Sequence, residues 1–306
     1  MPLVAFYLSM AYALPSLFLY DVTVVIVLSR WPTVRSSFFQ FYLFEFVMNT
    51  LTFLNAFVSI RLPSITCDTC PMAEFFRSAA RSESSVWNQF QYAMTFHMAY
   101  VQYATTAVVA VNRLTIIVNH TFFEKKWRDY SWICMLLLYT APFIVTYPVF
   151  LNPTYFQYDP VFDRFSLNCE YKSSTMFSYL VPVMSASTLV TLGSNTFSFC
   201  RLLKLAYKPP QLESNFLTVT IVASLTQLLG TLLSVSMLFG EPGSWLFNAT
   251  NIALPFVSDA LTLIQPYLLL IFCKGIRKYL VDLLVYLNCL IPIRVSSRGG
   301  AVSSIT

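Results

Sequence analysis

One apolar stretch decides the fold of this chain: YAMTFHMAYVQYATTAVVAVNRLTIIV, residues Tyr92–Val118. Arg113 is the one side chain in it that is fully charged at neutral pH. The stretch is longer than the roughly 20 apolar residues that an α-helix needs to cross a bilayer. A basic segment with Lys125, Lys126 and Arg128 follows, and such flanks are typical of the cytoplasmic side of a membrane helix. The sequence therefore predicts a membrane span with Arg113 at its cytoplasmic end.

Six further apolar runs divide the rest of the chain. They are Leu3–Leu28, Phe38–Ile60, Trp132–Leu151, Met176–Phe199, Phe216–Phe239 and Asn251–Phe272. Hydrophobic residues make up 57% of the chain, charged residues make up 11%, and the mean hydropathy is +0.62. A soluble domain carries about 25% charged residues. Strands of a membrane barrel would be about half as long and would alternate in polarity. We therefore expect an all-α integral membrane bundle of seven transmembrane helices.

The distribution of lysine and arginine predicts the orientation of this bundle. With the N-terminus outside, 14 of the 19 lysine and arginine residues fall in inner segments. Because these residues are enriched in cytoplasmic loops, we expect an outer N-terminus and a cytoplasmic C-terminus. The cations occur in short clusters between apolar runs, which is unlike a nucleic-acid-binding surface. The lipid bilayer is an expected partner, and nucleic acid is not.

A short amphipathic segment follows the last span. Between Ile276 and Leu287, apolar residues recur on one face of a predicted helix, and cations lie elsewhere. Such a helix lies on the surface of a membrane. We therefore expect one membrane domain over residues 1–290, with this surface helix beginning at about residue 274. Residues 291–306 are rich in Ser and Gly and are predicted to form a disordered cytoplasmic tail.

Three cysteines fall in the predicted outer loops, where oxidation permits disulfides. These are Cys67, Cys70 and Cys169. The Cys67-x-x-Cys70 spacing lacks the second pair of ligands that a metal site of this kind needs. We therefore favour a disulfide that links Cys169 to either Cys67 or Cys70 and joins the two loops. The sequence does not choose between these two partners.

Four polar residues within the predicted spans need an explanation, because ionisable groups in hydrocarbon cost free energy. Asp21 and Glu45 lie at similar depths in adjacent antiparallel spans, about 10 Å from the inner edge at 1.5 Å per residue. Asn49 is one helical turn beyond Glu45, and Asp259 lies near the middle of the last span. We expect a polar network of these four residues. This network either rearranges between two states of the bundle or has a structural purpose only. For Asp259 the alternative to the network is contact with a ligand from the outer side.

His97 lies in the outer half of the third predicted span, between Phe96 and Tyr100. A pocket for an external molecule would lie at this depth, so these three residues are candidates for its lining. The alternative is interior packing. Catalysis is not expected, because the chain has only two histidines and lacks the H-E-x-x-H, G-x-S-x-G and phosphate-loop motifs. The sequence predicts no catalytic residue, no metal site and no cofactor.

Several motifs together resemble one receptor family. Asn112-Arg113-Leu114-Thr115 stands where rhodopsin-like receptors carry acid-Arg-Tyr. Three further motifs are Phe38-Phe39-x-x-Tyr42-x-Phe44-Glu45, Arg61-Leu62-Pro63 ahead of Thr66-Cys67, and Val111–Thr115 followed by Glu124-Lys125-x-Trp127. With these motifs the chain resembles the nematode serpentine chemoreceptors of classes gamma and V.

The resemblance implies a G-protein-coupled receptor that sits in the plasma membrane of sensory neurons. Such a receptor is expected to detect a small external chemical (an odorant, tastant or pheromone) and to signal through a heterotrimeric G protein. On this interpretation Asn112, Arg113, Lys125, Lys126 and Arg128 face the G protein. Asn112 replaces the usual acid, which puts the ionic restraint on the neighbouring arginine in doubt. The alternative is a ligand-gated channel or transporter that uses the intramembrane acidic residues.

Overall fold

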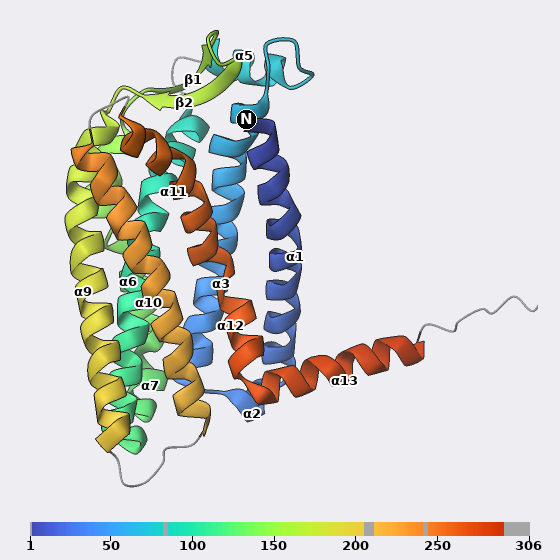
Figure 1. The fold of residues 1–306 in the computed structure, drawn as a ribbon, viewed down its shortest axis with the longest axis vertical. Helices are drawn as coiled ribbons and strands as arrows, with labels where there is room; N and C mark the ends of the chain where they lie inside the picture. The colour runs from blue at the N-terminus through green and yellow to red at the C-terminus, as the bar shows by residue number, and fades with distance from the viewer. Residues whose placement is uncertain (1, 82–84, 205–210, 241–243, 291–306) are drawn as a thin grey trace, which may run out of the picture.

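The computed structural model describes residues 2–81, 85–204, 211–240 and 244–290. The predicted disordered tail, 291–306, lies outside the described residues. Long helices run side by side as a bundle, with a β-hairpin at one end and a helix that projects sideways at the other (Figure 1). We call these the hairpin end and the α13 end. The chain starts at the hairpin end and its last described helix lies at the α13 end, as an odd number of crossings requires.

All seven predicted spans appear as helices. The elements in chain order are α1 (Pro2–Ser29), α2 (Trp31–Val34), α3 (Ser37–Ala56), the π-helical turn η1 (Phe57–Arg61), α4 (Leu62–Ile65), α5 (Ala73–Arg81), α6 (Val86–Val118), α7 (His120–Thr140), α8 (Phe143–Phe150), β1 (Thr154–Asp159), β2 (Arg164–Cys169), α9 (Ser173–Lys204), α10 (Gln211–Phe239), α11 (Trp245–Leu263), α12 (Gln265–Phe272) and α13 (Lys274–Leu290). Within the described residues, six helices are long and apolar enough to span a membrane. The pair α11 and α12 is long and apolar enough only when taken together, with a bend of 47° between the two helices, and it gives a seventh span if the pair crosses as one.

Three of the spans are interrupted, and proline accounts for two of the breaks. Pro142 separates α7 from α8, and Pro266 lies in the first turn of α12, directly after the bend. A proline lacks the N–H that an α-helix needs and its ring clashes with the preceding turn. The third interruption is the π-helical turn η1, which inserts one extra residue per turn between α3 and α4. The last residue of this turn is Arg61.

The fourth span begins earlier than predicted. Its first helix, α7, starts at His120, so the basic segment around Lys125 is helical and forms the first turns of α7. Asn119 caps this helix, because its side-chain oxygen accepts a hydrogen bond from the Phe122 N–H. Trp132, the predicted start of the span, is where the apolar part of the helix begins, and the helix itself begins 12 residues earlier.

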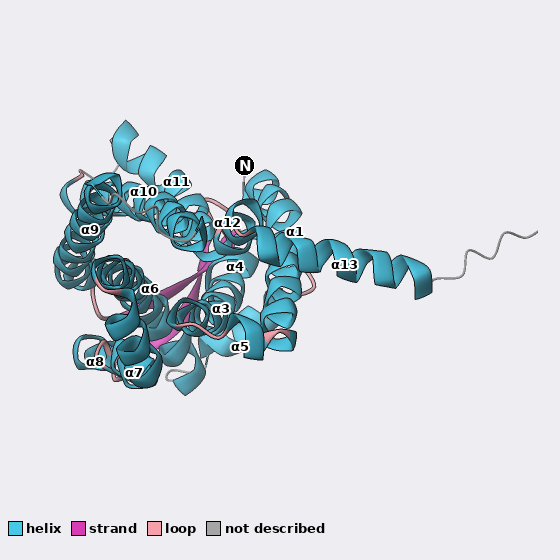
Figure 2. Cartoon of the chain, turned by 90° about the horizontal axis from the view of Figure 1, so that it is seen from below, coloured by secondary structure: helices cyan, strands magenta, loops and turns pink. Residues whose placement is uncertain are grey.

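Helix α6 is the central helix of the bundle (Figure 2). It packs against α3, α7, α8, α9 and α10. Of the most apolar 18-residue stretch of α6, half of the residues are buried inside the protein. In the corresponding stretch of α7 and α8, only 11% are buried. Large apolar side chains such as Val25, Leu137 and Leu189 lie exposed on the perimeter. Apolar side chains turned outward in this way are those of a membrane protein, whose perimeter contacts lipid.

A small layer at the hairpin end was not predicted. Strands β1 and β2 pair antiparallel, with Thr154 opposite Cys169 and Asp159 opposite Arg164. Phe156 and Phe165 pack on Phe76 of α5, with ring centroids 4.8 Å and 5.6 Å away. The alternation of buried and exposed side chains along β1 is the strand signal in this loop.

Hydrogen bonds to Asp163 tie this layer together. Its carboxylate accepts from the Asp68 backbone N–H at 2.9 Å and from the Tyr158 hydroxyl at 2.8 Å. These two bonds lower the pKa of Asp163, and the carboxylate in turn raises the pKa of Tyr158 to about 12. Asp163 adopts a positive φ of 46°, which Asp and Asn tolerate better than most residues.

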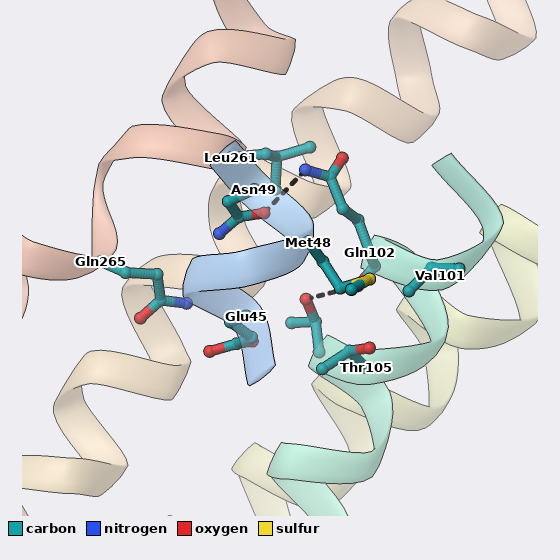
Figure 3. A pocket seen from close by; sticks show the side chains of 9 residues that line it. Glu45, Met48, Asn49, Val101, Gln102, Thr105, Leu261 and Gln265 are labelled. Carbon is teal, nitrogen blue, oxygen red and sulfur yellow. Dashed lines mark hydrogen bonds between the residues drawn. The ribbon is translucent and has the colours of Figure 1, made fainter. Parts of the chain in front are cut away.

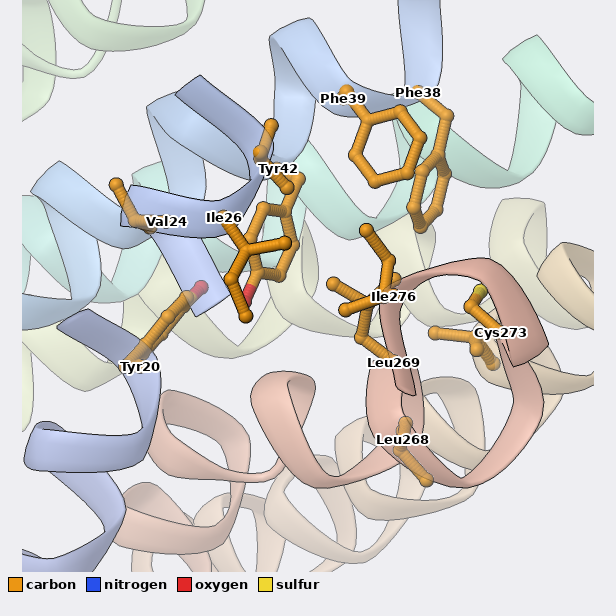
Figure 4. Packing of buried hydrophobic residues seen from close by; sticks show 12 residues of the cluster. Tyr20, Val24, Ile26, Phe38, Phe39, Tyr42, Leu268, Leu269, Cys273 and Ile276 are labelled. Atoms are coloured by element: carbon orange, nitrogen blue, oxygen red, sulfur yellow. The ribbon is translucent and has the colours of Figure 1, made fainter. Parts of the chain in front are cut away.

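The α13 end has its own apolar core (Figure 4). Tyr20 of α1, Tyr42 of α3, Leu269 of α12 and Ile276 of α13 are all buried in it. The first turn of α13 is therefore anchored in the bundle, while the rest of the helix projects sideways (Figures 1 and 2). A helix beginning at Lys274 confirms that part of the prediction. Its position on a membrane surface stays a prediction.

Candidate functional site

A cavity of about 210 Å³ lies in the hairpin half of the bundle. Residues of α3, η1, α6, α9, α10 and α11 line it. Most of its wall is apolar, with Phe96 and Ala99 on α6 facing Leu180 and Met184 on α9. The polar lining residues are Arg61, Thr95, Gln102, Tyr103, Ser234 and Ser258. An apolar cavity with a few polar groups is the usual form of a small-molecule site.

Of the three predicted pocket residues, only Phe96 lines this cavity. His97 is fully buried on another side of α6, where Nδ1 lies 3.3 Å from Thr146 Oγ1 and the ring centroid lies 4.1 Å from that of Phe143. Tyr100 is buried in an apolar cluster and is not among the lining residues. Neighbouring helical residues point about 100° apart, so depth in the membrane does not decide which face a side chain occupies. His97 and Tyr100 therefore do not line this cavity, and their burial fits the alternative of interior packing.

An ion pair borders the cavity, and sequence reasoning missed it. Arg61 Nη2 donates to Asp259 Oδ1, and the Tyr12 hydroxyl donates to Asp259 Oδ2. Both side chains of the ion pair are at least nine-tenths buried. The sequence assigned Arg61 to an outer loop, but η1 continues the helix and brings the guanidinium into the bundle. The available signal was that a buried acid such as Asp259 requires a cationic partner at similar depth.

A second, smaller cavity of about 20 Å³ lies deeper in the bundle (Figure 3). Glu45, Asn49, Gln102 and Gln265 are its polar lining residues besides two threonines. Gln102 Nε2 donates to Asn49 Oδ1 at 2.8 Å and to Thr262 Oγ1 at 3.2 Å. This volume is that of about one water molecule.

The structure brings together only two of the four residues of the predicted network. Glu45 and Asn49 share the small cavity, as expected. Asp21 is exposed on the perimeter of α1, and Asp259 pairs with Arg61 nearer the hairpin end. Asp21 and Asp259 were expected in the network but lie on other helix faces, which the sequence did not specify. Within the described residues, no group of three or more His, Cys, Asp or Glu side chains is arranged to hold a metal ion.

At the α13 end, Arg113 is buried with 1% of its surface exposed. Its Nε and Nη2 donate to Asn112 Oδ1 at 3.0 Å and 2.5 Å, and Nη2 also lies 3.4 Å from Ser37 Oγ. The Asn112 side chain donates to Ser37 Oγ at 3.1 Å. Glu124 of α7 then accepts from the Ser37 backbone N–H at 2.8 Å and from its hydroxyl at 2.7 Å. We call these four residues the Arg113 cluster.

The Arg113 cluster changes the expectation for the inner surface. Arg113 and Asn112 are both buried and do not lie on the surface of this structure, so their contact with a cytoplasmic partner stays a prediction. Although Asn112 replaces an acid, Glu124 reaches the same group of side chains through Ser37. Lys125 and Lys126 are exposed, and Arg128 is half-buried. The exposed cations of α7 thus directly follow Glu124, the residue that α7 contributes to the buried polar cluster.

The cysteines pair differently from the prediction. Cys67 and Cys70 form a disulfide with each other, with Cα atoms 5.1 Å apart. A tight turn, in which the Cys70 N–H donates to the Cys67 carbonyl at 3.1 Å, brings them together. Cys169 is a free thiol at the end of β2, packed against an apolar cluster of α6 and α9. The predicted link to Cys169 is therefore wrong.

Comparison with known proteins gives the family. The sequence matches the family described as "Srg family chemoreceptor" over residues 6–280. It is also 24% identical over 283 residues to serpentine receptor class gamma-31 of Caenorhabditis elegans, and the alignment covers 90% of each chain. The match spans all seven predicted membrane segments and the start of α13.

Proposed function

Since the chain belongs to the Srg family of chemoreceptors, we propose that it binds a small external chemical in the hairpin-end cavity and signals to a heterotrimeric G protein at its α13 end. The family is one of multi-pass membrane receptors and not of enzymes. The proposal also places the hairpin end outside the cell and the protein in the plasma membrane of sensory neurons. The lysine and arginine distribution supports this orientation.

The observation that carries the proposal is that one central helix joins the two sites. Phe96 lines the cavity and Arg113 lies 17 residues further along α6, which is about 25 Å at 1.5 Å per residue. A ligand that packs on α6 between α9 and α10 has a different contact energy in two arrangements of these helices. Only such a differential energy shifts a two-state equilibrium.

At the α13 end, the exposed cations are the proposed docking surface for the G protein. Lys125 and Lys126 lie on the first turns of α7, and Arg201 and Lys204 lie on the last turn of α9. The buried Arg113 has a different proposed part. The hydrogen bonds that Arg113 and Asn112 donate to Ser37 hold α6 against α3, and activation releases them.

A charge-reversal experiment tests this function. The chain is expressed in cells that report G-protein activation and is screened against small volatile and water-soluble chemicals. Replacement of Lys125 and Lys126 with Glu should abolish the response and leave surface expression unchanged. Lys172→Glu, an exposed cation at the hairpin end, is the matched control and should keep the response. An unchanged response in the α7 double variant would contradict the docking surface.

Two further measurements separate the alternatives. Tags at the two termini should be accessible on opposite sides of the membrane, with the N-terminal tag outside. Purified protein in lipid vesicles should carry no ligand-gated current, because a receptor acts through its G protein. A ligand-gated current from the purified protein would favour the channel interpretation over this one.

A further inference from the structure

Among the described residues that line the hairpin-end cavity, Arg61 alone carries a charge. Nη2 donates to Asp259, and the guanidinium carbon lies 4.9 Å from the centroid of the Phe53 ring. The other terminal nitrogen, Nη1, is buried and has no hydrogen-bond partner among the residues that the structure describes. A buried N–H without an acceptor costs free energy that a ligand can recover by supplying one.

The charge balance around Arg61 limits the kind of acceptor. Asp259 neutralises Arg61 and also accepts from the Tyr12 hydroxyl, so the pair carries no net charge. A carboxylate ligand would bring a second negative charge beside Asp259 in a region of low dielectric constant. An ammonium group would place a second cation beside Arg61. A neutral acceptor avoids both penalties.

The size of the cavity limits the rest of the molecule. An apolar cavity of about 150 Å³ holds benzene, so 210 Å³ corresponds to about eight non-hydrogen atoms. Phe96, Leu180 and Met184 provide an apolar wall for the hydrocarbon part. A carbonyl oxygen suits the polar end, because it accepts hydrogen bonds and brings no donor that must itself be satisfied.

We propose that the cavity takes a neutral, mainly apolar carbonyl compound of about eight non-hydrogen atoms. Its oxygen accepts from Arg61 Nη1, and its hydrocarbon part packs on α6 and α9. This inference rests on the proposed function above, because it names the chemical class of ligand for the same cavity. Specificity then comes from one hydrogen bond to a buried cation, and affinity comes mainly from apolar contact.

Three probes with equal numbers of non-hydrogen atoms test the inference. Cycloheptanone carries the carbonyl, methylenecycloheptane replaces its oxygen with a CH₂ group, and hexanoate carries a carboxylate. Binding is measured directly on the purified full-length protein in lipid nanodiscs, without a G protein. We expect cycloheptanone to bind about tenfold or more tightly than methylenecycloheptane, because a hydrogen bond to a charged group gives this discrimination. Hexanoate should bind more weakly than the ketone.

Two variants assign the preference to Arg61. The double variant Arg61→Met with Asp259→Asn removes the ion pair as a unit, so that neither charge is left buried alone. It should bind the ketone and the alkene equally. Met184→Ala, on the apolar wall, should weaken both probes to a similar extent and keep the preference for the ketone.

The outcomes distinguish this inference from the proposed function. Equal binding of ketone and alkene to the unaltered protein, tighter binding of hexanoate, or no binding of any probe at millimolar concentration would each overturn the inference. Selective ketone binding without any G-protein response would support the inference and contradict the proposed function. G-protein signalling to other chemicals, with no selectivity for the carbonyl, would do the reverse.

Discussion

The two halves of the bundle each bury an arginine, and the hydrogen bonds of these arginines differ. At the α13 end, the side chains of Asn112 and Ser37 accept from Arg113, and Glu124 completes the cluster. At the hairpin end, Arg61 is paired on one nitrogen, keeps an unpartnered nitrogen and borders a cavity of about 210 Å³. A buried cation holds helices together where neighbouring side chains accept its hydrogen bonds. Where one of its nitrogens has no acceptor among the described residues, as in Arg61, a candidate binding site remains.

The strongest test of this contrast removes the acid at the hairpin end. Asp259→Ala leaves Arg61 buried without its counter-ion and should destabilise the protein by about 3–5 kcal/mol. The measurement is the free energy or midpoint of unfolding of the purified protein. The double variant Arg61→Met with Asp259→Asn should lose much less. If the single variant were as stable as the double, the ion pair would not hold α11 to η1.

A second test opens the saturated end. Glu124→Gln removes the charge that accepts from the backbone and side chain of Ser37 at the start of α3. Loss of these charge-assisted bonds should cost about 1–2 kcal/mol. Ligand-independent signalling should rise as the Arg113 cluster loosens. Asp129→Asn, an exposed acid on the same helix, is the control and should alter neither quantity. A more stable or equally silent Glu124→Gln protein would show that the cluster does not hold the inner end closed.

Two glycines allow a comparison of the cavity wall with an open position: Gly230 lines the cavity, and Gly193 lies elsewhere, on α9. A Cβ at Gly230 would collide with the Tyr103 hydroxyl and would meet Leu261 and Val257 at 3.5 Å, whereas a Cβ at Gly193 meets nothing within 4 Å. Gly230→Ala should therefore cost about 1–2 kcal/mol and weaken ligand binding. Gly193→Ala should stabilise α9 by up to about 1 kcal/mol through helix propensity. Unfolding midpoints and ligand titrations of both variants check this, and equal effects would contradict the described cavity wall.

The smallest expected effect concerns the layer that β1, β2 and α5 form at the hairpin end. The pKa of Asp163 is lowered in the folded protein. Its contribution to the stability of the β1–β2 layer is therefore fully present above the ordinary carboxylate pKa of about 4, and it is lost as the pH falls through the lowered pKa. The protection of the β1 and β2 amides, which is the exchange rate relative to the intrinsic rate at the same pH, should therefore be constant from pH 7 to pH 5 and fall at more acidic pH. Asp163→Asn keeps a side chain suited to the positive φ and should remove this pH dependence. A pH dependence that persists in this variant would assign it to another group.

The fold could be predicted because a membrane helix satisfies its backbone hydrogen bonds within itself. Each span is therefore visible as a local run of apolar residues, and even the bend at Pro266 follows from one residue. The β-hairpin was missed because its strands are short and pack on Phe76 of α5, which is distant in sequence.

The site could be predicted only in part, because hydropathy gives depth and not direction. Phe96 and His97 lie at nearly equal depth, yet one lines the cavity and the other packs against Phe143. Asp21 was expected beside Glu45, but its face of α1 points to the perimeter. These outcomes depend on how each helix is rotated about its axis, which only its packed neighbours fix.

By itself, the sequence determined the helical membrane fold, the approximate limits of the spans and the resemblance to a chemoreceptor family. The tertiary structure alone decided which polar groups meet. Arg61 and Asp259 are 198 residues apart in sequence, and Ser37 and Glu124 are 87 apart. Such partners are selected by the rotation and bending of whole helices, including the π-helical turn η1, and no local run of residues records that geometry.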